Sequence, residues 1–188
     1  MLNSKEKIAG SIFFIAIFQF ILGLIVAELL YPGYNLSENY ISDLGIGPSA
    51  IVFNISIFIL GLLILLGTYF LYKTLKIKIL TILLIIIAIG SIGVGIFPEN
   101  IQPMHDIFAV IVFFFGGLTA IYSYKLMKIP LSIINIILGL ITLSAFVLFA
   151  TNLNLGLGPG GMERIIVYPI LIWTIMISIY LLKLTKKS

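Results

Sequence analysis

Six long apolar stretches divide this chain, and they constrain its fold more than any other feature. Crossing the hydrocarbon core of a membrane takes about 20 apolar residues in a helix, and each stretch comes close to or exceeds that length. Long runs of isoleucine and leucine without polar alternation favour helices over the strands of a transmembrane barrel. We therefore predict six transmembrane helices, over residues 8–30, 50–72, 79–97, 105–124, 131–151 and 162–183.

The composition excludes a soluble fold. Of the 188 residues, 61% are hydrophobic and only 10% are charged, whereas soluble domains carry roughly 25% charged residues. Connections between the stretches are short, so we expect one all-α, polytopic membrane helix bundle that forms a single transmembrane domain over residues 1–188. The chain has no cysteine, which excludes a disulfide framework, a thiolate metal site and a cysteine nucleophile.

The lysines predict the orientation of the bundle. Basic residues next to membrane spans stay preferentially in the cytoplasm, and six crossings place all ten lysines on one side. Both termini are then cytoplasmic, and the protein is a multi-pass protein of the cell membrane. The lysines flank the spans instead of forming one basic patch, so we expect no nucleic-acid partner. They are Lys5, Lys7, Lys73, Lys76, Lys78, Lys125, Lys128, Lys183, Lys186 and Lys187.

The predicted outer side carries almost all of the remaining charge. It holds the only histidine and the only arginine of the chain, together with six of its seven acidic residues. Six acids against one arginine give this side about five net negative charges, which disfavours broad attraction of anions. A cation or a zwitterionic head group fits better. The residues are Glu28, Glu38, Asp43, Glu99, His105, Asp106, Glu163 and Arg164.

Two of the candidate positions lie in the first and the third predicted outer segments. Ser42 and Asp43 follow apolar residues in a loop that we expect to fold back onto the bundle, where Asp43 serves as a metal ligand, a general base or a helix cap. His105 opens the fourth predicted helix, and a neutral imidazole there serves as acid, base or metal ligand. The adjacent Asp106 points about 100° away and complements the helix N-terminus.

A glycine-rich turn opens the sixth predicted helix and forms the third candidate. Gly160 and Gly161 leave backbone N–H groups free at a helix N-terminus, next to Glu163 and the guanidinium of Arg164. Free donors, the helix dipole and a guanidinium suit a phosphate or a carboxylate. A salt bridge from Arg164 to an acid of the same side is the structural alternative.

Three short runs occur in a characteristic order. They are Ser42-Asp43-Leu44-Gly45, the segment from Phe97-Pro98 to His105, and Gly161-Met162-Glu163-Arg164. In these runs nearly the whole chain resembles the six-helix prokaryotic membrane family catalogued as domain of unknown function 998. It is also distantly similar in layout to Frag1/DRAM/Sfk1-type membrane proteins, which are linked to lipid handling. The resemblance implies the fold and a set of outer polar positions, with no agreed activity: Ser42, Asp43, His105, Glu163 and Arg164.

The leading functional hypothesis is binding, with or without modification, of a lipid head group or another amphiphile by the outer polar cluster, because ionisable residues next to a span are costly. One alternative is a metal-dependent intramembrane hydrolase of the ceramidase-like type, in which Asp43, His105 and Glu163 hold a divalent metal and supply the catalytic groups. Others are a small transporter and a purely structural membrane protein. The sequence leaves open whether the protein is an enzyme and whether it forms oligomers, and it implies no other cofactor.

The predicted orientation can be tested by labelling introduced cysteines, because the native chain has none. In intact cells a membrane-impermeant thiol reagent should modify the Glu38→Cys variant and spare the Lys76→Cys variant. Permeabilised cells should show modification of both variants and serve as the control. Modification of position 76 but not position 38 in intact cells would reverse the orientation.

Overall fold

The computed structural model describes residues 5–183 and folds them into six long helices joined by turns, with no strand. All six helices are long and apolar enough to cross a membrane, which confirms the predicted helical class. The central part of each is only 22% to 44% buried within the protein, so lipid must cover the rest. The helices are α1 (Lys5–Leu30), α2 (Ala50–Leu75), α3 (Lys78–Ile96), α4 (Met104–Tyr122), α5 (Leu131–Ala150) and α6 (Gly158–Lys183).

The observed helix ends lie within three residues of the predicted ones, except at the start of α6. This helix begins at Gly158, four residues before the predicted residue 162. Pro159 fits the first turn because a proline there loses only an N–H group that would have no helical partner. Gly158 enters the helix with φ of +75°, a conformation that favours glycine. The glycine-rich run is therefore the first turn of α6 and not a loop before it.

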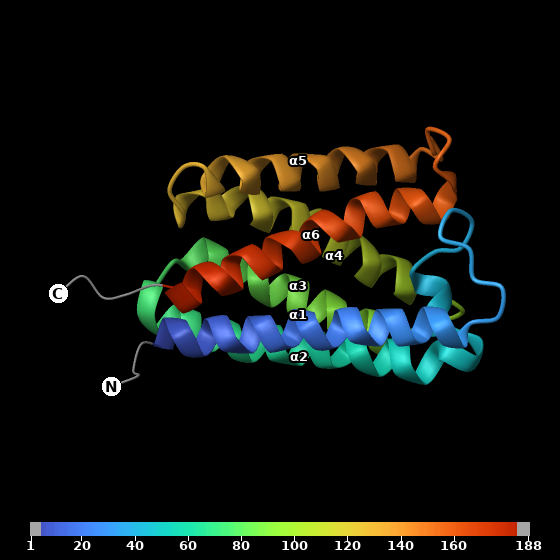
Figure 1. Cartoon of the computed structure of the whole chain (residues 1–188), viewed down its shortest axis with the longest axis horizontal. Helices are drawn as coiled ribbons and strands as arrows, with labels where there is room; N and C mark the ends of the chain where they lie inside the picture. The colour runs from blue at the N-terminus through green and yellow to red at the C-terminus, as the bar shows by residue number, and fades with distance from the viewer. Residues whose placement is uncertain (1–4, 184–188) are drawn as a thin grey trace.

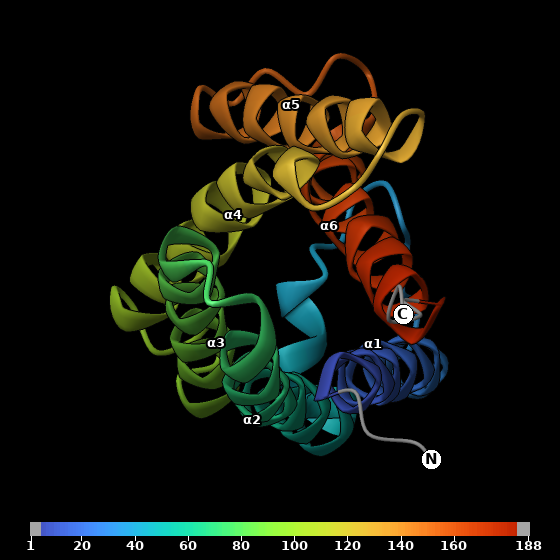
Figure 2. The same cartoon turned by 90° about the vertical axis from the view of Figure 1, so that its left-hand side faces the viewer.

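The helices form a ring of five with the sixth outside. Neighbours in the sequence pack side by side from α1 to α4, and α6 packs against α1 and also touches α4. Seen end-on in Figure 2, α1, α2, α3, α4 and α6 surround a central space, and α5 lies beyond α4 and α6. The segment between α1 and α2, drawn in light blue and cyan, crosses the far end of this space.

The two ends of the bundle differ in character. One end, on the left in Figure 1, holds both ends of the described chain and the connections 76–77 and 123–130. We call it the lysine end, because the eight described lysines lie there; Lys186 and Lys187 lie outside the described residues. The opposite end, which we call the polar end, holds the connections 31–49, 97–103 and 151–157.

Glycines allow the helices to approach closely. A Cβ atom on Gly61 would lie 2.7 Å from the carbonyl oxygen of Ala88, which joins α2 to α3. A Cβ atom on Gly139 of α5 would lie 2.5 Å from the carbonyl oxygen of Gly117 of α4. Small residues at such contacts are typical of membrane helices, which associate mainly through close packing.

Candidate functional site

The connection 31–49, which we call the cap segment, is bound to the first turn of α6. The carbonyl oxygen of Ser37 accepts hydrogen bonds from the amides of Gly160 at 2.8 Å and Gly161 at 3.3 Å. The Ser37 hydroxyl donates in return to the carbonyl oxygen of Leu157 at 2.6 Å. The backbone donors that the sequence suggested for an anionic ligand therefore bind the chain itself.

This contact needs glycine at the start of α6. A Cβ atom on Gly160 would lie 2.0 Å from the carbonyl oxygen of Asn39, and one on Gly158 would lie 2.3 Å from that of Ser37. Both distances are far below any van der Waals contact, and backbone atoms cannot move aside as a flexible side chain can. The glycines therefore let the cap segment lie directly on the helix.

Arg164 binds the same segment from the next turn of α6. Its side chain is only 7% exposed and forms a salt bridge with Glu28 at 3.4 Å. Its guanidinium also donates to the Tyr34 hydroxyl at 2.5 Å, and that hydroxyl donates to the carbonyl oxygen of Tyr40. Burial raises the pKa of Tyr34 well above its usual range, against the opposing effect of the Arg164 cation. Three carbonyl oxygens surround Nη1, those of Leu36, Asn39 and Gly160, at 2.9, 3.0 and 2.9 Å.

The side chain of Glu163 points away from that of Arg164, because adjacent helical residues project about 100° apart. Its carboxylate is buried and accepts a hydrogen bond from the amide of Ile41, with the Ser42 amide also in range. These amides begin the short 3₁₀ turn η1 (Ser42–Gly45). Glu163 thus fixes the part of the cap segment that lies across the end of the ring.

Asp43 does not cap a helix, because η1, the 3₁₀ turn Gly47–Ser49 and α2 all begin without a side-chain hydrogen bond at the N-cap. One of its carboxylate oxygens accepts hydrogen bonds from the Asn39 side chain at 3.0 Å and from the Tyr40 amide at 2.9 Å. These bonds close the turn that leads into η1. The structure shows how Asp43 shapes the cap segment.

Asp43 also lies beside Glu99, which sequence reasoning did not include among the candidate site residues. Burial, followed by the Asp43 carboxylate, raises the pKa of Glu99 from 4.5 to about 8, and the Ser42 hydroxyl acts in the opposite direction. Within residues 5–183, Glu99 Oε2 is buried and has no hydrogen-bond donor. With a pKa of about 8, Glu99 keeps its proton at neutral pH, since a buried carboxyl group beside a carboxylate does not ionise readily.

His105 is buried at the start of α4, with 4% of its surface exposed. Its Nδ1 atom lies 2.8 Å from the carbonyl oxygen of Phe97. A carbonyl oxygen can only accept, so we assign the proton to Nδ1 in the neutral ring. Nε2 then carries the lone pair and can accept a hydrogen bond or a proton.

A cavity runs inside the ring of helices, with about 80 Å³ open to the centre of a water molecule. Ser42, His105 and Glu163 line it at the polar end, and we call these three residues the cavity mouth. Phe13 and Ile177 line it much deeper. Glu163 and Ile177 are separated by 14 positions on α6, so at 1.5 Å per residue the cavity follows that helix for about 21 Å.

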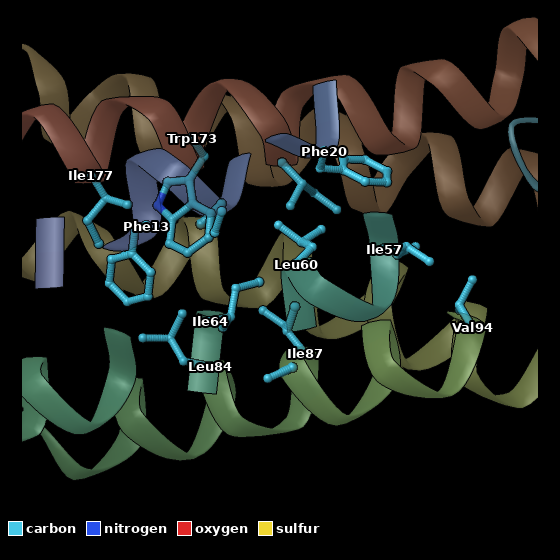
Figure 3. Packing of buried hydrophobic residues seen from close by; sticks show 14 of the residues in the cluster. Phe13, Phe20, Ile57, Leu60, Ile64, Leu84, Ile87, Val94, Trp173 and Ile177 are labelled. Atoms are coloured by element: carbon cyan, nitrogen blue, oxygen red, sulfur yellow. The ribbon is translucent and has the colours of Figure 1, made fainter. Parts of the chain in front are cut away.

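The walls below the mouth are almost entirely apolar. Figure 3 shows Phe13, Trp173 and Ile177 on one side of the interior and Leu84 and Ile87 on the opposite side. Five helices and the cap segment contribute to the lining, whereas α5 contributes none of it. The cavity is therefore enclosed by the five helices of the ring and the cap segment, without α5.

The structure sorts the predicted site residues into three groups. Ser42, His105 and Glu163 share the cavity mouth, Asp43 pairs with Glu99, and Arg164 with Gly160 and Gly161 holds the cap segment. Asp106 is exposed. Among residues 5–183, no three histidine, aspartate or glutamate side chains are grouped closely enough to hold a metal ion.

We predict that Arg164→Met lowers the free energy of unfolding by about 3–5 kcal/mol, because it leaves Glu28 and several buried carbonyl oxygens without their partner. Chemical denaturation of the purified protein in detergent measures the loss. Lys128→Met removes an exposed charge at the lysine end and should change the stability little. A variant as stable as the wild type would show that the contacts of Ser37 and Glu163 hold the cap segment without Arg164.

The raised pKa of Glu99 predicts a pH dependence of stability. In the folded protein Glu99 keeps its proton up to about pH 8, whereas in the unfolded chain it releases the proton near the ordinary pKa of 4.5. The bound proton therefore stabilises the fold fully below pH 4.5, and this stabilisation is lost as the pH rises through about 8. Melting temperatures between about pH 5 and pH 9 should therefore fall with rising pH in the wild type. The fall should be smaller in Glu99→Gln, whose neutral amide still donates to Asp43, and unchanged in the exposed control Glu38→Gln.

The comparison with known families covers the whole candidate site. A family model matches the chain over residues 14–180, which include the cap segment, the cavity mouth and most of α6. No curated protein and no solved structure matches the chain. The match confirms the resemblance seen in the sequence: the chain belongs to the family described as "Protein of unknown function (DUF998)".

Proposed function

We propose that this integral membrane protein binds a single-chain amphiphile in the cavity of its helix ring, with the polar head at the cavity mouth. The observation that carries the proposal is the shape and chemistry of the cavity: an apolar interior about 21 Å deep that begins at Ser42, His105 and Glu163. Filling such a space with an apolar chain is favourable, because the chain leaves water and contacts the apolar walls. The three polar groups are placed to fix its orientation, as is usual in ligand sites.

The depth of the cavity favours one long chain. The hydrocarbon core of a membrane is about 30 Å thick, so each leaflet contributes about 15 Å. A cavity of about 21 Å along α6 extends past the middle of the bilayer if its mouth lies at one surface. It therefore suits an extended chain with a small head, drawn from the surrounding lipid.

The cavity mouth favours a head group that donates hydrogen bonds. The Glu163 carboxylate and Nε2 of His105 are acceptors, and the polar end carries an excess of acids over its one arginine. Arg164 and the first amides of α6 are already bound to the cap segment, so they are not free for a phosphate. A hydroxyl or ammonium head group fits these partners better than an anion does.

The lysines support the proposed side for the cavity mouth. The proposal places the protein in the cell membrane with the lysine end in the cytoplasm. The mouth then faces outward, and the amphiphile comes from the outer leaflet. This orientation is the one that the cysteine-labelling experiment tests.

Blocking the cavity should abolish binding. Ala109 lines the cavity one turn after His105, whereas the next residue, Val110, is 47% exposed on the outer surface of the bundle. In Ala109→Phe the ring fills the upper cavity, so we expect the amount of co-purified lipid, measured by native mass spectrometry, to fall at least tenfold. Val110→Phe adds similar bulk outside and should retain lipid as the wild type does.

A thermal-shift measurement provides the second readout. A long-chain monoacylglycerol at 100 times its dissociation constant should stabilise the wild type by about 2.7 kcal/mol, because a ligand stabilises through its affinity for the folded state. A fatty acid of equal chain length should stabilise the wild type less at the same concentration. Its carboxylate cannot donate a hydrogen bond to the acceptors at the cavity mouth, the Glu163 carboxylate and Nε2 of His105. Equal shifts in the wild type and Ala109→Phe would mean that the amphiphile binds elsewhere.

A further inference from the structure

The one tryptophan of the chain places a polar atom deep in the cavity. Trp173 lies on α6, is 2% exposed and lines the cavity. Within the described part of the chain its indole Nε1 is buried and has no hydrogen-bond acceptor. Figure 3 shows the indole projecting from α6 into the interior, with its nitrogen on the edge near Phe13 and Ile177.

The surroundings of this nitrogen offer nothing for it to bind. Phe13 and Ile177, beside it in Figure 3, have no polar side-chain atoms. Thr174 is the polar residue next to it in the sequence; its hydroxyl donates to the carbonyl oxygen of Ile170 and does not accept a hydrogen bond from Nε1. A buried water needs two to four polar partners, whereas the side chains beside Nε1 in Figure 3, Phe13 and Ile177, are apolar. A water is therefore a poor partner here.

We propose that Nε1 of Trp173 donates a hydrogen bond to an oxygen atom carried partway along the chain of the bound amphiphile. The ligand class is then an amphiphile whose chain bears a hydroxyl or a carbonyl group, and not a plain hydrocarbon chain. This inference rests on the proposed function and specifies its ligand.

The geometry sets where along the chain the oxygen lies. Glu163 at the mouth and Trp173 are separated by ten positions on the same helix, which corresponds to about 15 Å. The oxygen therefore belongs about two-thirds of the way along a chain that fills the cavity, well away from the head. The separation of these two polar contacts sets how much apolar chain lies between the head group and the oxygen.

Selectivity follows from the unpaired donor. A plain chain that fills the cavity leaves Nε1 without a partner, whereas a chain with an oxygen at the right depth satisfies it. Sites with a buried polar group discriminate strongly against ligands that lack its partner. For one neutral hydrogen bond we expect the matched chain to bind about tenfold more tightly than the plain chain.

The experiment compares monoacylglycerols of one chain length whose acyl chains are plain or carry a hydroxyl at successive positions. Dissociation constants are measured by calorimetry for the wild type and for Trp173→Phe, which keeps an aromatic ring and removes the donor. One hydroxyl isomer should bind the wild type about tenfold more tightly than the plain chain. In Trp173→Phe this preference should disappear. The control Ile172→Phe, on the exposed side of α6, should keep it.

Fluorescence of the wild type gives a readout that needs no variant, since Trp173 is the only tryptophan. A monoacylglycerol with a brominated chain should quench its emission, and the matched hydroxyl isomer should shift the emission to longer wavelength relative to the plain chain. Absence of both binding and quenching would overturn the proposed function itself. Quenching and binding of plain chains, with no isomer favoured, would overturn only the role of Trp173.

A third result would also overturn the inference. If the preference for the matched hydroxyl persists in Trp173→Phe, another group must bind the oxygen. If that variant does not fold, the wild-type emission decides the question, because it reports on the indole itself: a shift with the isomer that binds most tightly supports the inference, and no shift overturns it.

Discussion

The buried guanidinium of Arg164 is the interaction on which the arrangement of the polar end depends. A cation this far from water is stable only if it is paired and hydrogen-bonded, and its partners come from α1, the cap segment and the first turn of α6. One side chain thereby fixes three parts of the chain together. With the cap segment held, Ile41 and Ser42 reach Glu163, and the end of the helix ring is covered.

This use of Arg164 changes the chemistry left for a ligand. The cation and the free amides at the start of α6 would suit an anion, but the carbonyl oxygens of the cap segment occupy them. What still faces the cavity is the acceptor side of the site, the Glu163 carboxylate and Nε2 of His105. The proposed preference for a head group that donates hydrogen bonds follows from this, because the donors of the polar end are already used in folding.

The sequence predicts the helices well because length, apolarity and the position of lysines are local signals. It predicts the site only in part. Glu163 and Arg164 are neighbours, and only their divergence by about 100° on a helix indicates that they serve different partners. The pairing of Glu99 with Asp43 and the unpaired nitrogen of Trp173 depend on how distant segments meet, so no local pattern reveals them. The one available signal is that Trp173 is the only tryptophan, in a chain rich in other aromatic residues.

A cavity of this size would cost stability if nothing filled it, and the proposed chain would remove that cost. At about 24 cal/mol per Å³, a cavity of 80 Å³ destabilises the fold by about 2 kcal/mol, and an unpaired indole N–H adds about 1–3 kcal/mol. Larger side chains at Ala109 or Ser91, which both line the cavity, would reduce the first cost without any change of fold. Binding sites commonly keep such stability losses because function requires them. The polar mouth, the apolar walls and the unpaired donor about 15 Å below the mouth therefore support the proposed ligand better than they support imperfect packing.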